Sequence, residues 1–258
     1  MSTDLALATA AADAADTLTF AAFRRPGLAV ETKADRTPVT EVDRAVEAEV
    51  RTLIAQRRPE DAFVGEETGT TGSGPRRWIL DPIDGTVNFI RGVPVWATLL
   101  ALEVDGEIEL GMVSSPVLGR RWWAERGSGA FAASAGAPPE PLRVSRTASL
   151  GGALVSSGCI NDFADPGALV AIAERTARDR GFGDFWQHVL VAEGTIEAAL
   201  EPVCSLWDIA ALQVIVEESG GKFTDFSGAR RLDTGSAISS NGFVHEELVG
   251  LLLGRSVP

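Results

Sequence analysis

The chain has 258 residues, of which 45% are hydrophobic, which is enough for one large domain or two closely packed halves. Its formal net charge of -13 at pH 7 argues against binding to nucleic acid, which requires a basic face. No apolar run reaches the roughly 20 residues of a membrane span, and the only cysteines, Cys159 and Cys204, form neither a disulfide framework nor a cysteine-type zinc site.

The chain begins with an alanine-rich stretch, MSTDLALATAAADAADTLTFAAFRR. This stretch lacks a basic start and is interrupted by Asp4, Asp13 and Asp16, so it predicts an amphipathic helix and not a signal peptide. We therefore expect a cytoplasmic protein without a membrane partner.

The stretch TPVTEVDRAVEAEVRTLIAQ predicts a second helix. Thr37 is the expected N-cap, and Pro38 the first helical residue, where proline is well tolerated. The apolar residues that recur at helical spacing are Val39, Val42, Val46, Val50 and Leu53.

Short strands follow this helix. AFVG and WIL are each followed by carboxylates, and Asp105-Gly106 between two apolar runs predicts a hairpin. RRWWAERGSGAFA continues an antiparallel sheet, with Gly127 and Gly129 as turn residues.

The proline-rich stretch GAPPEPLRVS predicts a boundary near residue 142. Beyond it, strand-like and helix-like patterns alternate, and Gly220-Gly221 marks the end of a long helix. We expect an N-terminal α+β half over residues 1–142, with an antiparallel sheet and metal-site motifs. The C-terminal half, over residues 143–258, is expected to be of α/β type and to carry the substrate-specificity segment.

The stretch WILDPIDGTVNF, residues 78–89, brings two carboxylates to the end of a strand. Pro82 cannot continue a central ladder, so Asp81 is expected where the strand ends. The IDGT segment then predicts a helix start, whose free N–H groups and dipole favour phosphate. Asp84 lies beside that anion site, and the Ile83 carbonyl is available as a ligand. An ordinary Asp-Pro turn is the alternative.

Other acids stand at comparable places: Glu66 and Glu67 after a strand, Asp208 in a first helical turn after Ser205, and Asp43 early in the second helix. Each alone is more readily structural. Two carboxylates about 4 Å apart repel by about 4 kcal/mol at an effective dielectric of about 20, so converging acids must bind protons or cations. Hard oxygen ligands favour magnesium or manganese over zinc. The only histidines, His188 and His245, lack ligand spacing and are expected to be structural.

These segments, together with KADRTPVTEVD and LWDIAALQVIVEESGG, resemble the inositol monophosphatase family of magnesium-dependent, lithium-sensitive phosphatases over residues 5–250 or thereabouts. The resemblance implies a mixed α+β and α/β fold, a layered α-β-α-β-α sandwich of the sugar-phosphatase type. It also implies a homodimer.

The resemblance further implies the roles of individual residues. The first-metal ligands would be Glu66, Asp81 and the Ile83 carbonyl; the second-metal ligands would be Asp81, Asp84 and Asp208. Glu66 would help hold a third Mg²⁺, and Mn²⁺ is an alternative ion. Asp43 and Thr86 would orient the attacking water, and the amides of Gly85 and Thr86 would hold the phosphate. Val87 departs from the family pattern, but it lies past this cradle.

The stretch GDFWQH resembles the histidinol-phosphate phosphatase branch of the family. Asp184 and Glu201 would then bind the two cationic ends of histidinol by charge-assisted hydrogen bonds, with Trp186 packed nearby. The alternatives are that Asp184 caps a helix and that Trp186 belongs to the core.

We therefore expect a small phosphate monoester as substrate, with L-histidinol phosphate hydrolysed to L-histidinol and phosphate. The first alternative is an inositol-1-phosphate phosphatase or a broad-specificity sugar or polyol phosphatase. The second is a non-catalytic regulator that binds a protein.

Overall fold

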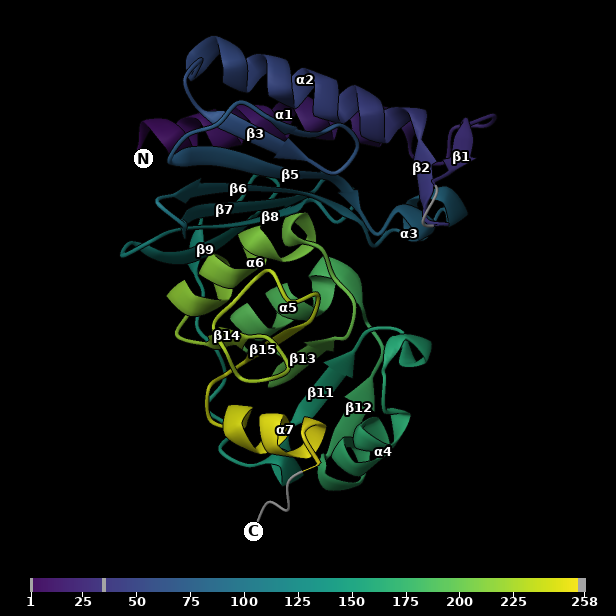
Figure 1. The fold of residues 1–258 in the computed structure, drawn as a ribbon, viewed down its shortest axis with the longest axis vertical. Helices are drawn as coiled ribbons and strands as arrows, with labels where there is room; N and C mark the ends of the chain where they lie inside the picture. The colour runs from purple at the N-terminus through teal and green to yellow at the C-terminus, as the bar shows by residue number, and fades with distance from the viewer. Residues whose placement is uncertain (1, 34–35, 255–258) are drawn as a thin grey trace.

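The computed structural model describes residues 2–33 and 36–254. Helices and sheets alternate in layers along the long axis of the molecule (Figure 1). This confirms the predicted α-β-α-β-α sandwich. Ala34 and Asp35, which belong to the early KADRTPVTEVD segment, lie outside the described residues.

The first outer layer consists of α1 (Thr3–Ala22) and α2 (Glu41–Arg57). The alanine-rich helix is confirmed by α1, whose apolar side packs on α2 and the large sheet. Among the described helices, none combines the length and apolar character that crossing a membrane requires.

The predicted start of the second helix is wrong. Its N-cap is Thr40, not Thr37, and Pro38 lies in β2 (Pro38–Thr40), paired with β1 (Val30–Thr32). The reason is a capping box: the Asp43 carboxylate accepts a hydrogen bond from the Thr40 backbone N–H. Thr37 has no acid three residues later, so it cannot form this arrangement.

The large sheet has eight strands. In spatial order they are β10 (Glu140–Pro141), β9 (Gly129–Ser134), β8 (Arg120–Glu125), β7 (Glu107–Ser115), β6 (Ala97–Val104), β5 (Arg76–Asp84), β3 (Ala62–Gly65) and β4 (Gly69–Thr71). Only the β3–β5 pair is parallel among them. The predicted hairpin is confirmed: Asp105 and Gly106 take φ values of 53° and 86° between β6 and β7.

Both faces of this sheet are buried. Along β6, Leu100 and Leu102 face α1 and α2, whereas Leu99 and Ala101 face the middle layer. That layer consists of α5 (Asp184–Ala192) and α6 (Leu206–Glu218). The residues of α6 from 209 to 216 are all buried, because the helix lies between two sheets.

The smaller sheet has the strand order β12 (Arg178–Arg180), β11 (Leu154–Ser157), β13 (Ala198–Glu201), β15 (Ala237–Ser240) and β14 (Lys222–Thr224). The last layer consists of α4 (Pro166–Arg175) and α7 (His245–Leu252). Two short 3₁₀ helices, η1 (Leu150–Gly152) and η2 (Ile160–Asp162), flank β11.

The end of β5 differs from the prediction. The strand does not stop at Asp81: its register with β6 shifts after Asp81, and pairing resumes where Asp84 faces Ala97. Pro82 therefore lies in an irregularity where its missing N–H breaks no ladder hydrogen bond. This bend turns the chain into α3 (Thr86–Arg91) and directs both aspartates to one side.

Candidate active site

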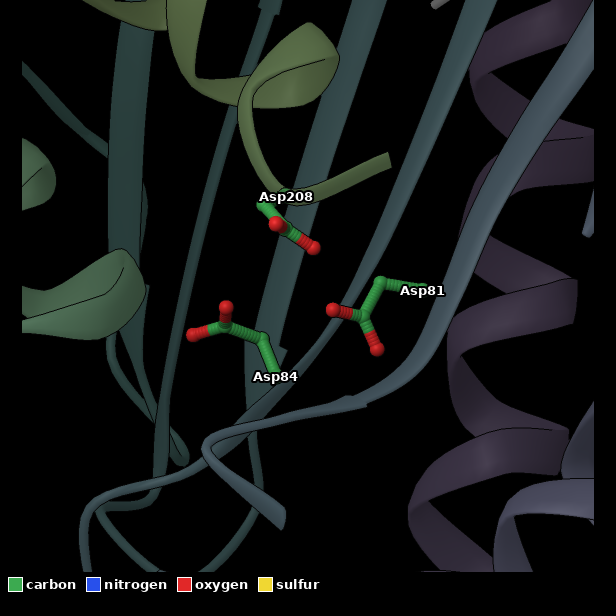
Figure 2. A group of neighbouring side chains, drawn as sticks. All are labelled: Asp81, Asp84 and Asp208. Carbon is green, nitrogen blue, oxygen red and sulfur yellow. The ribbon is translucent and has the colours of Figure 1, made fainter. Parts of the chain in front are cut away.

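Three carboxylates from two distant segments converge at the end of β5. Asp81 and Asp84 lie on β5, and Asp208 lies in the first turn of α6 (Figure 2). One oxygen of each lies within 4.8 Å of those of the others. The structure thus brings together three of the predicted ligands.

Backbone amides hold each of these side chains. Asp208 accepts from the Ser205 N–H (2.7 Å) in the capping box of α6, and Asp81 accepts from the Ile83 N–H (2.9 Å). Asp84 accepts from the Phe185 N–H (2.7 Å) at the start of α5. The carboxylates are therefore fixed in place even though they repel one another.

The electrostatic cost of this arrangement is visible in the pKa values. Burial, together with the charge of Glu66, raises the pKa of Asp81 well above its usual value. Burial and the charge of Asp184 do the same for the pKa of Asp84. Burial is also the main reason why the pKa of Asp208 is raised to about 7. Such a cluster favours a bound cation.

Glu66 lies just after β3 and is not one of the three clustered carboxylates. Its Oε1 is 2.6 Å from the Lys33 ammonium, and Lys33 also contacts Glu67 at 2.6 Å. Glu66 is nevertheless close enough for its charge to raise the pKa values of Asp81 and Asp208. Its role as a ligand stays a prediction.

Asp43 has one satisfied and one unsatisfied oxygen. Oδ2 accepts from the Thr40 backbone N–H (2.9 Å) and from its hydroxyl (2.5 Å). Oδ1 is buried and has no hydrogen-bond partner among the described residues. Burial, reinforced by the charges of Glu66 and Glu67, raises the pKa of Asp43 to about 6. A buried unpaired oxygen of this kind points to a missing partner such as water or a ligand.

The turn after Asp84 places further polar groups beside the carboxylates. Gly85 has φ 81° and precedes α3, whose first N–H groups have no acceptor within the helix. The Thr86 hydroxyl donates to the Ile83 carbonyl (2.9 Å). Among the described residues, no hydrogen bond is found between Thr86 and Asp43, the pair that the family resemblance joins at the water.

A cavity of about 80 Å³ lies beside Asp84 and Asp208, and the rest of its lining comes from the C-terminal half of the chain. Its other lining residues are Asp184, His188, Glu201, Val203, Cys204 and Ile209. The structure thus places both predicted specificity acids beside the clustered carboxylates. A larger cavity, of about 510 Å³, lies beside α1 and the outer face of β7, β8 and β9, and none of the predicted site residues lines it.

The pKa values of the two predicted specificity acids are also raised. Burial raises the pKa of Asp184, and burial with the charges of Asp184 and Asp208 raises the pKa of Glu201 to about 8. Asp184 is the first residue of α5, after the cap residue Gly183, and has φ 49°. Its Oδ2 accepts from Asn88 Nδ2 (3.1 Å). Left-handed backbone at a non-glycine residue is uncommon and is often found at functional sites.

The remaining predicted residue, Trp186, does not line this cavity. It packs on Phe182 with ring centroids 5.6 Å apart, at the edge of the core between the sheets. His188 was expected to be structural and not part of the site, yet it lines the cavity and is 1% exposed. The available signal was its spacing, four residues after Asp184, which puts both on one helix face.

Comparisons with known proteins agree with this geometry. The model of the inositol monophosphatase family matches residues 1–254. A histidinol-phosphatase of Mycobacterium tuberculosis is 48% identical over 251 residues, covering 95% of this chain and 96% of the relative. One of Streptomyces coelicolor is 45% identical, covering 98% and 97%. Among solved structures, an IMPase of Thermotoga maritima has a TM-score of 0.86 at 34% identity, covering 97% of this chain and 96% of that chain.

Proposed function

Because the chain belongs to the inositol monophosphatase family of phosphoric monoester hydrolases, we propose that it hydrolyses L-histidinol phosphate to L-histidinol and phosphate with the help of Mg²⁺. The two relatives named above, both called histidinol-phosphatase, cover nearly the whole chain and support this substrate. The observation that carries the proposal is the small cavity in which Asp184 and Glu201 adjoin the clustered carboxylates.

The donor set fits magnesium. Asp81, Asp84 and Asp208 offer hard oxygen atoms close together, which suits Mg²⁺ better than zinc. We propose that these residues, with Glu66 and the Ile83 carbonyl, hold two or three Mg²⁺ ions and that Mn²⁺ can replace them. When bound, the metal would make water a stronger nucleophile and stabilise charge on the leaving oxygen.

The protein's own groups would position the reacting molecules. The unpaired, buried Oδ1 of Asp43 is a ready acceptor for the hydrogen of the attacking water, and Thr86 would assist it. The amides of Gly85 and Thr86, at the start of α3, would donate to the phosphate oxygens. Positioning of this kind accounts for much of the acceleration in phosphoryl transfer.

Recognition of the alcohol part would rest on Asp184 and Glu201. A carboxylate facing an ammonium or imidazolium forms a charge-assisted hydrogen bond, which a neutral polyol cannot replace. Both acids lie in the same small cavity as Asp84, so the phosphate and the alcohol part of the substrate would be bound side by side. Trp186 would pack against the outside of this pocket and not within it.

One observation favours a second candidate, an inositol-phosphate or broad-specificity polyol phosphatase. The pKa of Glu201 is raised to about 8, mainly by burial, so the free pocket holds this group in its protonated form at neutral pH. A protonated carboxyl pairs well with the hydroxyl group of a polyol. A cationic substrate would instead favour the ionised form of Glu201.

The deciding experiment is phosphate release from the purified protein with Mg²⁺, comparing L-histidinol phosphate with inositol 1-phosphate at equal concentration. We expect a preference of roughly 100-fold or more for L-histidinol phosphate, because a site built to bind particular polar groups rejects analogues that lack them. An excess of EDTA should abolish the release. Comparable rates for the two esters would favour the broad-specificity candidate.

We also propose that the protein acts in the cytoplasm as a homodimer and binds neither nucleic acid nor membranes. The net charge of -13 supports the absence of nucleic-acid binding. Light scattering after size-exclusion chromatography would measure the oligomeric state directly, and a monomeric mass would refute the dimer.

A further inference from the structure

A fully buried glutamine stands directly behind the proposed specificity pocket. Gln187 lies on α5, three residues after Asp184, and its side chain is 0% exposed. Its Nε2 donates to Glu201 Oε2 (2.7 Å) and, at 3.4 Å, to the Leu200 carbonyl. A buried amide therefore binds one of the two acids that line the cavity.

The direction of this amide is determined by its other neighbours. The Ser156 hydroxyl accepts from the Phe182 N–H (3.1 Å), so its own hydrogen is free to be donated to Gln187 Oε1 (2.8 Å). The acceptor end of the Gln187 amide is thereby satisfied by Ser156. The donor end must then face Glu201, which is the end that stabilises a carboxylate.

The opposite side of Glu201 is confined by a glycine. A β-carbon placed at Gly158 would lie 2.2 Å from Glu201 Oε1, so the carboxylate occupies the space that a side chain would need there. Glu201 is thus held between Gly158 and the Gln187 amide at the end of β13. Two independent contacts fix one orientation of this acid at the cavity wall.

We propose that Gln187 is a positioning residue for substrate specificity: its amide holds the Glu201 carboxyl group at the cavity wall, so that the ionised group accepts a hydrogen bond from a cationic nitrogen of the substrate alcohol once that nitrogen binds. This inference rests on the proposed function, because it assigns Glu201 to substrate recognition. Without the amide donor, Glu201 would face the like charges of Asp184, Asp208 and Asp162 with nothing to stabilise its ionised form.

The test is a double-mutant cycle on the KM for L-histidinol phosphate. Gln187→Met removes all three hydrogen bonds of the amide but keeps the length of the side chain. It should raise this KM about tenfold, since a hydrogen bond to a charged group contributes on the order of 1.5–3 kcal/mol. The values of kcat, and both constants for inositol 1-phosphate, should change by less than about twofold. The double variant with Glu201→Gln should be no worse than Glu201→Gln alone, because Gln187 acts through Glu201.

Two further variants separate positioning from packing. Ser156→Ala removes the donor that orients the amide, and should raise the same KM in the same direction but less. Gln213→Met removes another buried glutamine, on α6, and should leave both substrates unaffected. If Gln187→Met does not fold, the cycle is run with Ser156→Ala and Glu201→Gln.

Additive effects of Gln187→Met and Glu201→Gln, or equal changes for both substrates, would overturn the inference. Failure of the proposed function looks different: the unmodified protein would then not prefer L-histidinol phosphate. In that case the cycle is measured on the phosphate ester that it does prefer, and additivity there would again reject the coupling between Gln187 and Glu201.

Discussion

Asp208 and Asp225 are both acids in the C-terminal half, but their surroundings differ in kind. Burial would raise the pKa of Asp225, yet hydrogen bonds from Ser227 and Ala229 outweigh it and hold that pKa below its usual value. The Asp225 Oδ1 accepts from the Ser227 N–H (2.8 Å), the Ser227 hydroxyl (2.6 Å) and the Ala229 N–H (3.0 Å). Asp208 instead faces other acids. The Asp225 carboxylate therefore stabilises a turn, whereas the Asp208 carboxylate destabilises the metal-free fold.

This contrast predicts that neutralising the two acids changes the Tm of the metal-free protein in opposite directions. Asp208→Asn should remove most phosphatase activity and yet raise the Tm of the metal-free protein, because it removes a charge from a cluster of like charges. Asp225→Asn, the matched control, should lower the Tm, because a loop acceptor is weakened, and should keep the activity. Phosphate release with Mg²⁺ measures the activity of both variants, and thermal melting in EDTA measures their Tm. Full activity of a folded Asp208→Asn variant would contradict its role as a ligand.

Asp184 carries a prediction about specificity. Asp184→Asn keeps the shape of the side chain and its contact with Asn88 but removes the charge that would attract a cationic substrate. We expect the KM for L-histidinol phosphate to rise about tenfold or more, and that for inositol 1-phosphate to change much less. Steady-state kinetics with the two esters measures the difference. An equal effect on both would leave Asp184 with only the structural role of beginning α5.

At the scale of elements, the position of Asp208 depends on how closely α6 approaches β7. A β-carbon added at Gly111 in β7 would lie 2.3 Å from the Ala211 carbonyl oxygen and 2.7 Å from Val214 Cγ1. The first of these atoms is backbone and cannot rotate away. The glycine therefore permits a helix–sheet contact that any larger residue would force apart.

We expect Gly111→Ala to lower the free energy of unfolding by about 1–3 kcal/mol, the usual cost of overpacking a core. Activity should fall as well, because Asp208 lies on the same helix, one turn before Ala211. The control is Gly151→Ala, since nothing lies within 4 Å of a β-carbon there and its φ is ordinary. Urea denaturation of both variants measures the cost, and a neutral Gly111→Ala would show that α6 can move.

Features that depend on neighbouring residues in the sequence were predictable, and features that depend on tertiary packing were not. The Asp105-Gly106 hairpin was readable because a turn is set by neighbouring residues, and the three acids were readable from their local motifs although β5 continues past Pro82. The start of α2 was misplaced because Pro38 suits both a helix start and a short strand, and the Asp43 carboxylate decides between them. The contact of Gln187 with Glu201 required the fold, since it joins α5 to β13.

At the scale of the whole molecule, the two proposed halves, 1–142 and 143–258, share one core. The cluster between the sheets combines β5, β6 and β7 of the first half with α5, α6 and β13 of the second. Alone, residues 1–142 would expose the inner face of the large sheet to water, at a cost of about 25 cal/mol for each Å² of apolar surface. We therefore expect one cooperative unfolding transition, with coincident circular dichroism and fluorescence melts, and two separate transitions would show independent domains.

The clustered acids also make the stability of the whole molecule depend on pH and metal. The pKa values of Asp208 and Glu201 are raised to about 7 and about 8, mainly by burial. An unfolded carboxyl has a pKa near 4, so above about pH 4 the folded, metal-free protein binds more protons than the unfolded chain and loses stability as the pH rises. Buried His188 and His245 act in the opposite direction, because burial lowers their pKa values to about 3 and about 4.

Between about pH 7 and about pH 8, the pH dependence of stability reports mainly on the acids. The histidines are then mostly neutral in the folded protein and also in the unfolded chain, where their pKa is near 6.5. In EDTA we expect the free energy of unfolding to fall across this interval by on the order of 1–3 kcal/mol. Saturating Mg²⁺ should reduce that slope, since a bound cation favours the ionised form of the carboxylates around it at every pH in the interval. Asp208→Asn should reduce the slope in EDTA without any metal, and Glu201 should account for most of what remains. Thermal melts over a pH series, with and without Mg²⁺, measure all three, and a stability in EDTA that rises with pH would mean that the acids are not held close together in solution.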